Sequence, residues 1–576
     1  MDQSREPSPT TAAASTDPNR VTPRTDNDDK RGGASKKHGP LYWLGVNLTK
    51  MLRDYIRKHK IGFVLLSVGV VVTLFLTRAL WQPHVIGLRR SLGLVTIGVL
   101  LLCLAYLGMQ IKSRKWKVIV PLLCILSMFG YAYAAHLGYD FYEYVQLWYR
   151  FNTLPIERID RLPETDHERI QPRNAIYNLS KTKVADSESL PRPDFVKINE
   201  EYRWTIPIEP KYWQNRLMGN VREIFNVPAT ESSPSFSKQN RVTVDFDTGE
   251  FLYLGKNVFT NTVKTFGFWR FLNYQPSDAR HIVDGKGQWV QAVSLVRWKG
   301  LFFPRPEFGG VHIVPQVEKK GKVTNIFSRL FFGKGTWIPP DEIKDHPYLV
   351  GQNLVPQMVS RFNAQSLRFK NGFFAPFPGR HRGDIRIPDL QSDVNDQPFT
   401  TFFKFADAAK NKLYHYFSLE PYHPGRHGLN TSLLVPADGL GNCYVYYHAD
   451  KDEALTGVSA VATKVMDTKK NYGWGNIMPV EYRPWIKTIN GKRRFFWLTT
   501  VVTKTHNQTK VSAKEKSKDS RQTSTNDDET DQNFLTGSVP EIALMEAERD
   551  IVVWVDPLKP DGWIAQVTQA FEDLWK

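Results

Sequence analysis

Three long apolar runs follow one another early in the chain, at residues 61–81, 91–111 and 117–139. A helix needs about 20 apolar residues to cross a bilayer, and each run has that length without the polar face of a soluble helix. No charged residue lies in the middle of a run, which disfavours the buried ionisable groups of a pump or transporter. The pattern predicts three transmembrane helices, the first two joined as a hairpin by residues 82–90.

The segments before the first run predict two further elements. Residues 1–40 are rich in Ser, Thr, Pro and Asp and almost lack large apolar side chains. Such a segment cannot bury enough surface to offset the entropy of ordering, so we expect a disordered tail. Residues 41–60 space their apolar side chains as a helix does and end in basic residues. They predict an amphipathic helix at the inner membrane surface or, as an alternative, a helix packed on soluble protein.

Basic residues at the ends of the runs predict the orientation in the membrane. They are Arg53, Arg57, Lys58 and Lys60 before the first run, and Lys112, Arg114, Lys115 and Lys117 between the second and the third. Lys and Arg concentrate on the cytoplasmic side, so we expect a multi-pass protein with the N-terminus in the cytoplasm and the C-terminal region outside. Arg89 and Arg90, between the first two runs, count against this orientation.

Beyond the third run, residues 140–195 predict an aromatic juxtamembrane helix followed by a polar connector, because Tyr and Trp favour the membrane interface. Residues 196–576 hold short runs of Val, Ile, Thr and aromatic residues between Gly, Asp and Asn, which is typical of strands and hairpins. Strands are expected at 241–254 (a hairpin turning at 247–249), 289–303, 310–317, 431–436, 443–448, 457–465, 493–503, 540–545 and 550–555.

Helical spacing marks two segments of the same region. One is at about 340–366, where Pro356 predicts a kink or a later start, and the other is the end of the chain from residue 561. The fold class that we expect is a three-helix transmembrane anchor plus a large α+β extracytoplasmic region rich in antiparallel strands, divided into two subdomains.

A polar interval at residues 503–538 separates two expected strands and predicts a disordered loop within the fold. The formal net charge is +18, and much of it lies beside the apolar runs and in polar segments. Juxtamembrane basic residues attract anionic lipid, and no nucleic-acid-binding motif accompanies the charge. We therefore expect the lipid bilayer as a partner and no nucleic acid.

The sequence selects no catalytic residue. Three cysteines in 576 residues exclude a disulfide framework and Cys-rich metal modules. His423 and His427 are four residues apart, but a proline and a glycine between them argue against the helix that would align them as metal ligands. His415 and His448 are the other histidines that such a site would recruit. We expect no metal and no cofactor.

Two similar PGRH turns, at 378–381 and 424–427, form the candidate ligand-binding site. Arg380, His381, Arg426 and His427 would bind a phosphate or a carboxylate if they converge, because an Arg guanidinium can bridge two oxygens. The alternative is a pair of solvated turns with local ion pairs.

These observations favour a membrane-anchored protein whose extracytoplasmic region binds or scaffolds other membrane or envelope proteins, or envelope polymers, without catalysis. Two alternatives stay open: a membrane-anchored envelope hydrolase or transferase, and an accessory subunit of a membrane protein complex. A deep cavity with convergent acid, His or Arg groups would favour an enzyme, and a broad apolar patch would favour a partner.

Overall fold

A computed structural model of the chain describes residues 60–136, 140–231, 236, 240–317, 332–377, 381, 383–390, 397–423, 425–451, 454–474, 477–504, 534–535 and 541–573. The expected tail at 1–40 and almost all of the amphipathic helix at 41–60 lie outside these residues. The chain forms two compact units, Met1–Thr73 and Leu74–Lys576. The second unit contains all the strands that the structure describes.

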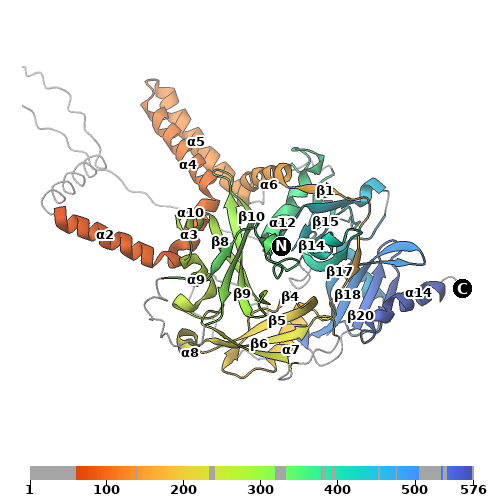
Figure 1. The fold of residues 1–576 in the computed structure, drawn as a ribbon. Helices are drawn as coiled ribbons and strands as arrows, with labels where there is room; N and C mark the ends of the chain where they lie inside the picture. Colours follow the sequence, from red (N-terminus) through yellow and green to blue (C-terminus); the bar gives the residue numbers. More distant parts are fainter. Residues whose placement is uncertain are drawn as a thin grey trace, which may run out of the picture. The chain divides into compact units, whose positions relative to one another are not determined.

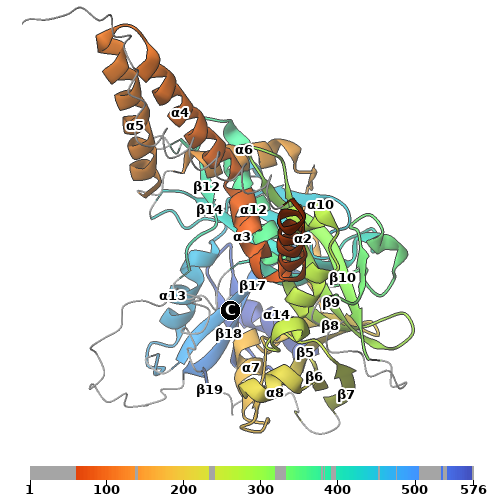
Figure 2. The ribbon, with the colours of Figure 1, turned by 90° about the vertical axis from the view of Figure 1, so that its left-hand side faces the viewer.

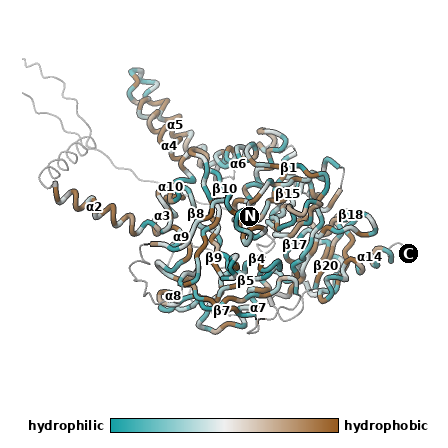
Figure 3. Tube along the Cα trace, in the orientation of Figure 1, coloured by the Kyte–Doolittle hydropathy of each residue, from teal (hydrophilic) through white to brown (hydrophobic). Residues whose placement is uncertain are grey.

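Two described helices are long and apolar enough to cross a membrane, α4 (Leu92–Gln110) and α5 (Arg114–His136). A third candidate arises if α2 (Lys60–Leu76) and α3 (Arg78–Arg90) together count as one broken span. Figure 3 shows α4 and α5 as apolar along most of their length. The apolar runs of the sequence are therefore helical, and their length and composition allow a membrane protein.

Residues 82–90, expected as a hairpin loop, lie instead in α3, which packs on the α+β region. Ile86 is buried in a cluster with Trp298 and Val359. On the same face, Gln82 Nε2 donates to the Tyr274 carbonyl at 2.7 Å. The prediction of a loop was wrong because the polar side chains of this segment satisfy backbone carbonyls of the region rather than water.

Arginines at both ends of α3 extend this contact. Arg78 Nη2 donates to the Lys264 carbonyl at 2.6 Å. At the other end, Arg89 donates to the Leu301 carbonyl at 2.9 Å and to Asn273 Oδ1 at 3.1 Å. Hydrogen bonds from a charged donor are stronger than neutral ones, so α3 is firmly attached to the region.

Helices α4 and α5 form a hairpin that projects from the α+β region (Figures 1 and 2). At its base, a Cβ added to Gly93 would lie 2.0 Å from the Phe302 carbonyl oxygen. Near its tip, a Cβ added to Gly108 would lie 2.6 Å from Val120 Cγ1. Glycine at these two positions lets the helix backbone approach its neighbours closely, as small residues do between membrane helices.

The remaining helices cover and connect the sheets. They are α6 (Phe141–Thr153), α7 (Arg173–Lys181), α8 (Trp213–Met218), α9 (Val258–Lys264), α10 (Phe268–Asn273), α12 (Gln357–Ser366), α13 (Val458–Thr468) and α14 (Trp563–Asp573). Short 3-10 turns lie at Leu254–Lys256, Ile343–Asp345, Leu367–Asn371, Ala408–Lys410, His448–Lys451 and Pro560–Gly562.

The described strands form four sheets. Sheet 1 has the order β1 (Ile156–Arg158), β16 (Cys443–Tyr447), β15 (Thr431–Pro436), β14 (Lys412–Pro421), β13 (Phe399–Lys404), β2 (Glu164–Asp166), with β12 (Ile385–Arg386) also on β14. Sheet 2 has the order β11 (Thr336–Ile338), β10 (Arg305–Pro315), β9 (Trp289–Lys299), β8 (Tyr274–Val283). All described pairs are antiparallel except β1 with β16, which are parallel.

The other two sheets come from the ends of the α+β sequence. Sheet 3 has the order β17 (Ile477–Ile489), β18 (Lys492–Lys504), β20 (Glu541–Glu546), β21 (Val552–Val555), with β19 (Phe534–Leu535) also on β18. Sheet 4 has the order β3 (Glu188–Ser189), β5 (Glu201–Pro210), β6 (Val221–Pro228), β7 (Arg241–Phe246), with β4 (Asp194–Ile198) also on β5. The α+β class with antiparallel sheets is therefore confirmed.

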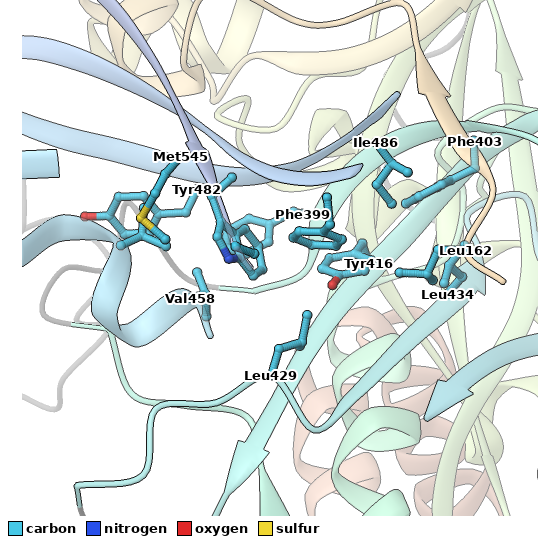
Figure 4. Close-up of a cluster of buried hydrophobic side chains, with 14 of the residues drawn as sticks. Leu162, Phe399, Phe403, Tyr416, Leu429, Leu434, Val458, Tyr482, Ile486 and Met545 are labelled. Atoms are coloured by element: carbon cyan, nitrogen blue, oxygen red, sulfur yellow. The ribbon is translucent and has the colours of Figure 1, made fainter. Parts of the chain in front are cut away.

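Sheets 1 and 3 share the largest aromatic core. Tyr416 and Phe403 of sheet 1 pack with Trp497 and Ile486 of sheet 3, and all four side chains are buried (Figure 4 shows Tyr416, Phe403 and Ile486). Burying one such side chain contributes roughly 1.5–3 kcal/mol relative to leaving it exposed. This cluster holds the middle of the chain against its C-terminal part.

The segment at 140–195, expected as a helix and a connector, contributes several elements to the fold. Helix α6 begins at its own N-cap, since the Asp140 carboxylate accepts from the Tyr142 and Glu143 N–H groups. Arg150 on α6 donates to Asn363 Oδ1 at 2.7 Å and pairs with Glu307 at 3.2 Å. The aromatic helix therefore packs against α12 and β10.

Sequence-derived elements agree with the structure in most of sheets 1–3. The Asn490–Gly491 turn joins β17 to β18 with positive φ at both residues, 51° and 74°. Of the helix expected at 340–366, α12 begins directly after Pro356, and the C-terminal helix is α14. Within the expected loop at 503–538, Thr503 and Lys504 of β18 pair with Leu535 and Phe534 of β19. The residues between these two strand segments lie outside the described residues.

One expected strand, at 457–465, is a helix. Val458, Val461 and Val465 of α13 are all buried, at the i, i+3, i+7 spacing of one helical face. The Glu420 carboxylate accepts the Ser459 N–H at 2.9 Å and so satisfies a free donor at the N-terminus of α13. Valine enrichment predicted a strand, but a carboxylate from β14 and one buried face favour the helix.

The second arm of the hairpin expected at 241–254 is also absent from the described strands. Residue Glu209 on β5 is 1% exposed, and its carboxylate accepts the N–H groups of Glu250 and Phe251, each at 2.8 Å. A Cβ added to Gly249 would lie 2.8 Å from the Glu209 carboxyl group. These N–H groups pair with a side chain, so the segment cannot continue as a ladder strand.

Glu209 should make the stability of the fold depend on pH. Burial raises the pKa of its carboxyl to about 7, against 4.5 for the free group, although the N–H groups of Phe251 and Glu250 oppose the shift. Because the pKa is higher in the folded protein than in the unfolded chain, the protonated Glu209 carboxyl contributes to the stability of the fold. This contribution is complete below pH 4.5 and is lost as pH rises through 7. The loss is on the order of 1–3 kcal/mol.

We therefore expect Glu209→Gln to flatten the dependence of unfolding free energy on pH between about 4.5 and 7, measured by denaturant unfolding of the detergent-solubilised protein. The test uses the slope of the unfolding free energy against pH and not its absolute value, because the amide of Gln also changes one hydrogen bond at every pH. Glu231→Gln, at an exposed position, is the control and should keep the wild-type slope. An unchanged slope in Glu209→Gln would show that this carboxyl does not titrate on unfolding.

Candidate functional site

The first PGRH turn ends in a buried ion-pair cluster. Arg380 lies outside the described residues. His381 stacks on Tyr422 with ring centroids 3.7 Å apart, and its Nδ1 lies 3.0 Å from Asp384 Oδ2. The Arg368 guanidinium donates to the same oxygen at 2.9 Å. The Asp384 side chain is fully buried, so its charge is held by these two partners.

The second turn contacts the N-terminus of α13, which begins at Val458. His427 is exposed, and its Nδ1 lies 2.9 Å from Ser459 Oγ, which in turn donates to Glu420 Oε2 at 2.5 Å. Burial raises the pKa of the Glu420 carboxyl, while Ser459, His427 and Arg386 oppose that shift. Arg426 is exposed, and its backbone N–H closes the turn on the His423 carbonyl.

Both turns meet the same end of β14. Ile385 and Arg386 of β12 pair with Pro421 and Glu420 of β14, and the Arg386 guanidinium lies over the Tyr422 ring at 5.4 Å. His381 contacts this strand end through Tyr422, and His427 contacts it through Ser459 and Glu420. Each histidine is engaged within the protein. Anion binding by the two turns stays a prediction.

A buried hydrogen-bond chain has the order of a catalytic triad. His415 Nδ1 accepts from Ser360 Oγ at 2.6 Å, and its Nε2 donates to Asn353 Oδ1 at 2.8 Å. Ser360 and His415 are both 0% exposed. Burial lowers the pKa of His415 to about 3, so the ring stays neutral. A nucleophilic serine must contact its substrate, and Ser360 is fully buried. We therefore assign a structural role to this hydrogen-bond chain.

Within the described residues, no group of three His, Cys, Asp or Glu side chains is placed to hold a metal ion. His448 is buried, and its Nε2 lies 2.9 Å from Ser432 Oγ. His423 and His427 lie in a turn rather than on a helix.

A cavity of about 620 Å³ lies where α3 and α4 meet the α+β region. Its walls come from α3, the first turn of α4, α6, β9, β10 and α12. The lining residues that carry charge are Arg90, Asp140, Glu143 and Arg361, and the apolar ones include Leu94, Trp298, Met358 and Phe362. Because these residues come from segments far apart in the chain, no local sequence motif predicts the cavity.

Charged residues of both signs line this cavity. The Arg90 guanidinium lies over the Trp298 ring at 4.8 Å, and Arg361 Nη1 donates to the Gln397 carbonyl at 3.2 Å. The Glu143 side chain is open to the cavity yet partly surrounded by protein. This partial burial raises the pKa of the Glu143 carboxyl, the nearby Asp140 carboxylate adds to the shift, and Arg368 opposes it.

Comparisons with protein families, curated proteins and solved structures found no match to this chain. The site must therefore be judged on its own geometry.

The contacts of the two turns predict effects on stability of different size. Asp384→Asn should destabilise the protein by roughly 1–3 kcal/mol, because it leaves the buried side of Arg368 without its anionic partner. Arg426→Ala, at an exposed position, should change the free energy of unfolding by about 0.5 kcal/mol or less. Denaturant unfolding of both variants checks this. Equal effects would mean that the Asp384 cluster does not stabilise the fold.

Proposed function

We propose that this chain is a membrane-anchored binding protein. Its helices hold the α+β region outside the cytoplasm, and that region binds or scaffolds other membrane or envelope proteins, or envelope polymers, without catalysis. The observation that carries this proposal is a group of exposed aromatic and apolar side chains on and beside α8. Helix α8 lies at the end of the region away from the α4–α5 hairpin (Figures 1 and 2).

The hairpin supports the proposed orientation. Gly93 at the start of α4 contacts the region, and Tyr131 near the end of α5 donates to Asp140 at the start of α6 at 2.7 Å. Both ends of the hairpin therefore meet the region, and residues 111–113 form its far tip. Lys112, Arg114, Lys115 and Lys117 lie at that tip. If the hairpin spans the membrane, these basic residues favour a cytoplasmic tip and place the region outside.

Cysteine labelling of intact cells tests this orientation. In a background with Cys103 and Cys124 replaced by serine, Ser517→Cys should react with a membrane-impermeant thiol reagent before lysis. Ser113→Cys, at the tip of the hairpin, should react only after the membrane is opened. The native Cys443 is buried and should contribute little background. The reverse pattern would place the α+β region in the cytoplasm.

The α8 surface has the composition of a protein-binding patch. The exposed fractions of Tyr212, Trp213, Met218 and Tyr253 are 54%, 62%, 77% and 42%. Arg216 lies among them, with its guanidinium 5.6 Å from the Tyr253 ring centroid and its backbone carbonyl accepting the Tyr253 N–H. Trp, Tyr and Arg are the residues that most often carry binding energy at interfaces. Their exposure is unfavourable in water, so a bound partner would stabilise the surface.

Site-specific photo-crosslinking in native membranes tests the α8 surface. A photoreactive residue at Trp213 should give a discrete adduct, which Met218→Glu should strongly reduce because it places a charge in the apolar patch. The same photoreactive residue at exposed Glu231 is the control. Digestion of the adduct with a protease or with glycan-cleaving enzymes distinguishes a protein partner from an envelope polymer. No adduct at Trp213, or the same adducts at both positions, would contradict the proposal.

A further inference from the structure

If α4 spans the bilayer as proposed above, the cavity between α3, α4, α6 and α12 lies at the level of the membrane surface. Helix α4 has 19 residues, about the length that crosses the hydrocarbon core, so its first turn lies at the interface when it spans the bilayer. Leu94, in that first turn, lines the cavity. The cavity therefore opens where lipid headgroups meet acyl chains.

Exposed apolar side chains neighbour the lining residues of the cavity along the chain. Leu88 on α3, Phe141 on α6 and Phe302 in the turn between β9 and β10 are 56%, 56% and 50% exposed. Tyr142 of α6 joins this turn to α3, because its hydroxyl donates to the Phe302 carbonyl at 2.7 Å and lies 3.1 Å from the Arg90 carbonyl. Such side chains are stable at a lipid interface and unfavourable in water. The same surface continues along α4 through Val95 and Leu102, which are 42% and 58% exposed.

The polar groups of the cavity match a headgroup that carries both signs of charge. Arg90 and Arg361 supply two guanidinium groups, which suit a phosphate diester. Asp140 Oδ1 is already engaged by two N–H groups and by the Tyr131 hydroxyl. Glu143, by contrast, has no side-chain hydrogen bond or ion pair with the other described residues, and it faces the same cavity.

We propose that this cavity binds a phospholipid with a primary-ammonium headgroup, of the phosphatidylethanolamine type. Its phosphate lies against Arg90 and Arg361, its ammonium donates to Glu143, and its acyl chains follow the apolar surface of α4. An ammonium with N–H donors fits a carboxylate better than a quaternary choline, which has none. The proposal rests on the membrane anchorage proposed above but not on the α8 surface.

Native mass spectrometry of the purified full chain tests this proposal. The protein is exchanged into detergent with equal amounts of phosphatidylethanolamine, phosphatidylcholine and phosphatidylglycerol, and the retained lipids are counted. We expect phosphatidylethanolamine to be retained about tenfold over either competitor, the size of one charge-assisted contact. Equal retention of the three lipids, or preference for phosphatidylglycerol, would overturn the proposal.

Charge variants test the binding of the two ends of the headgroup, phosphate and ammonium, separately. Arg90→Gln with Arg361→Gln should lower retention of every lipid about tenfold, because the phosphate loses its partners. Glu143→Gln should remove only the preference for phosphatidylethanolamine over phosphatidylcholine. Arg222→Gln and Glu231→Gln, at exposed positions elsewhere, are the matched controls and should behave as wild type. Wild-type retention in the cavity variants would overturn the site.

A cavity-filling variant tests the site independently, in case the charge variants do not fold. Gly87 of α3 lines the cavity, and a Cβ added there meets no atom within 4 Å. Gly87→Phe should therefore fill the cavity, reduce lipid retention about tenfold and leave the melting temperature at or above that of wild type, since glycine is unfavourable inside a helix. Full retention in a folded Gly87→Phe protein would overturn the proposal. Topology labelling is read separately, so failure of the lipid site and failure of membrane anchorage can be told apart.

Discussion

The attachment of α3 to the α+β region is the contact on which the rest of the arrangement depends. Arg78, Gln82 and Arg89 donate to backbone carbonyls of that region, and Ile86 fills an apolar cluster between them. A buried donor that loses its acceptor costs about 1–3 kcal/mol, so these bonds resist separation of helix and region. Because α3 runs directly into α4, the hairpin is carried on a fixed base instead of a flexible linker. With α3 held in this way, a cavity lies between α3, α4, α6 and α12.

Much of this fold follows from local patterns in the sequence. The apolar runs became helices, and most alternating segments of the C-terminal half became strands with turns such as Asn490–Gly491. The failures share one cause, which is a partner distant in sequence. Glu209 takes the N–H groups that would have formed a strand at 250–254, Glu420 caps α13, and the carbonyls of Lys264 and Tyr274 receive the polar face of α3. Local propensity cannot show such partners.

The candidate sites also divide into those that local sequence reveals and those that depend on residues distant in sequence. The two PGRH turns were visible as motifs, and the structure brings His381 and His427 to one strand end, where both already have partners in the protein. The cavity had no motif, because Arg90, Glu143 and Arg361 are hydrophilic residues on three separate helices. Only the packing of α3, α6 and α12 places them around one space. A sequence analysis can therefore find a repeated turn but not a site assembled from single residues.

The parallel pairing of β1 with β16 has a consequence for how the chain is made. Residues 156–158 leave the ribosome first, yet their partner strand, residues 443–447, is synthesised last in sheet 1. At about 5–20 residues per second, β1 waits roughly 15–60 s for that partner. During this interval β1 lacks its only described strand partner. Sheet 1 is therefore completed only after its last strand has been synthesised.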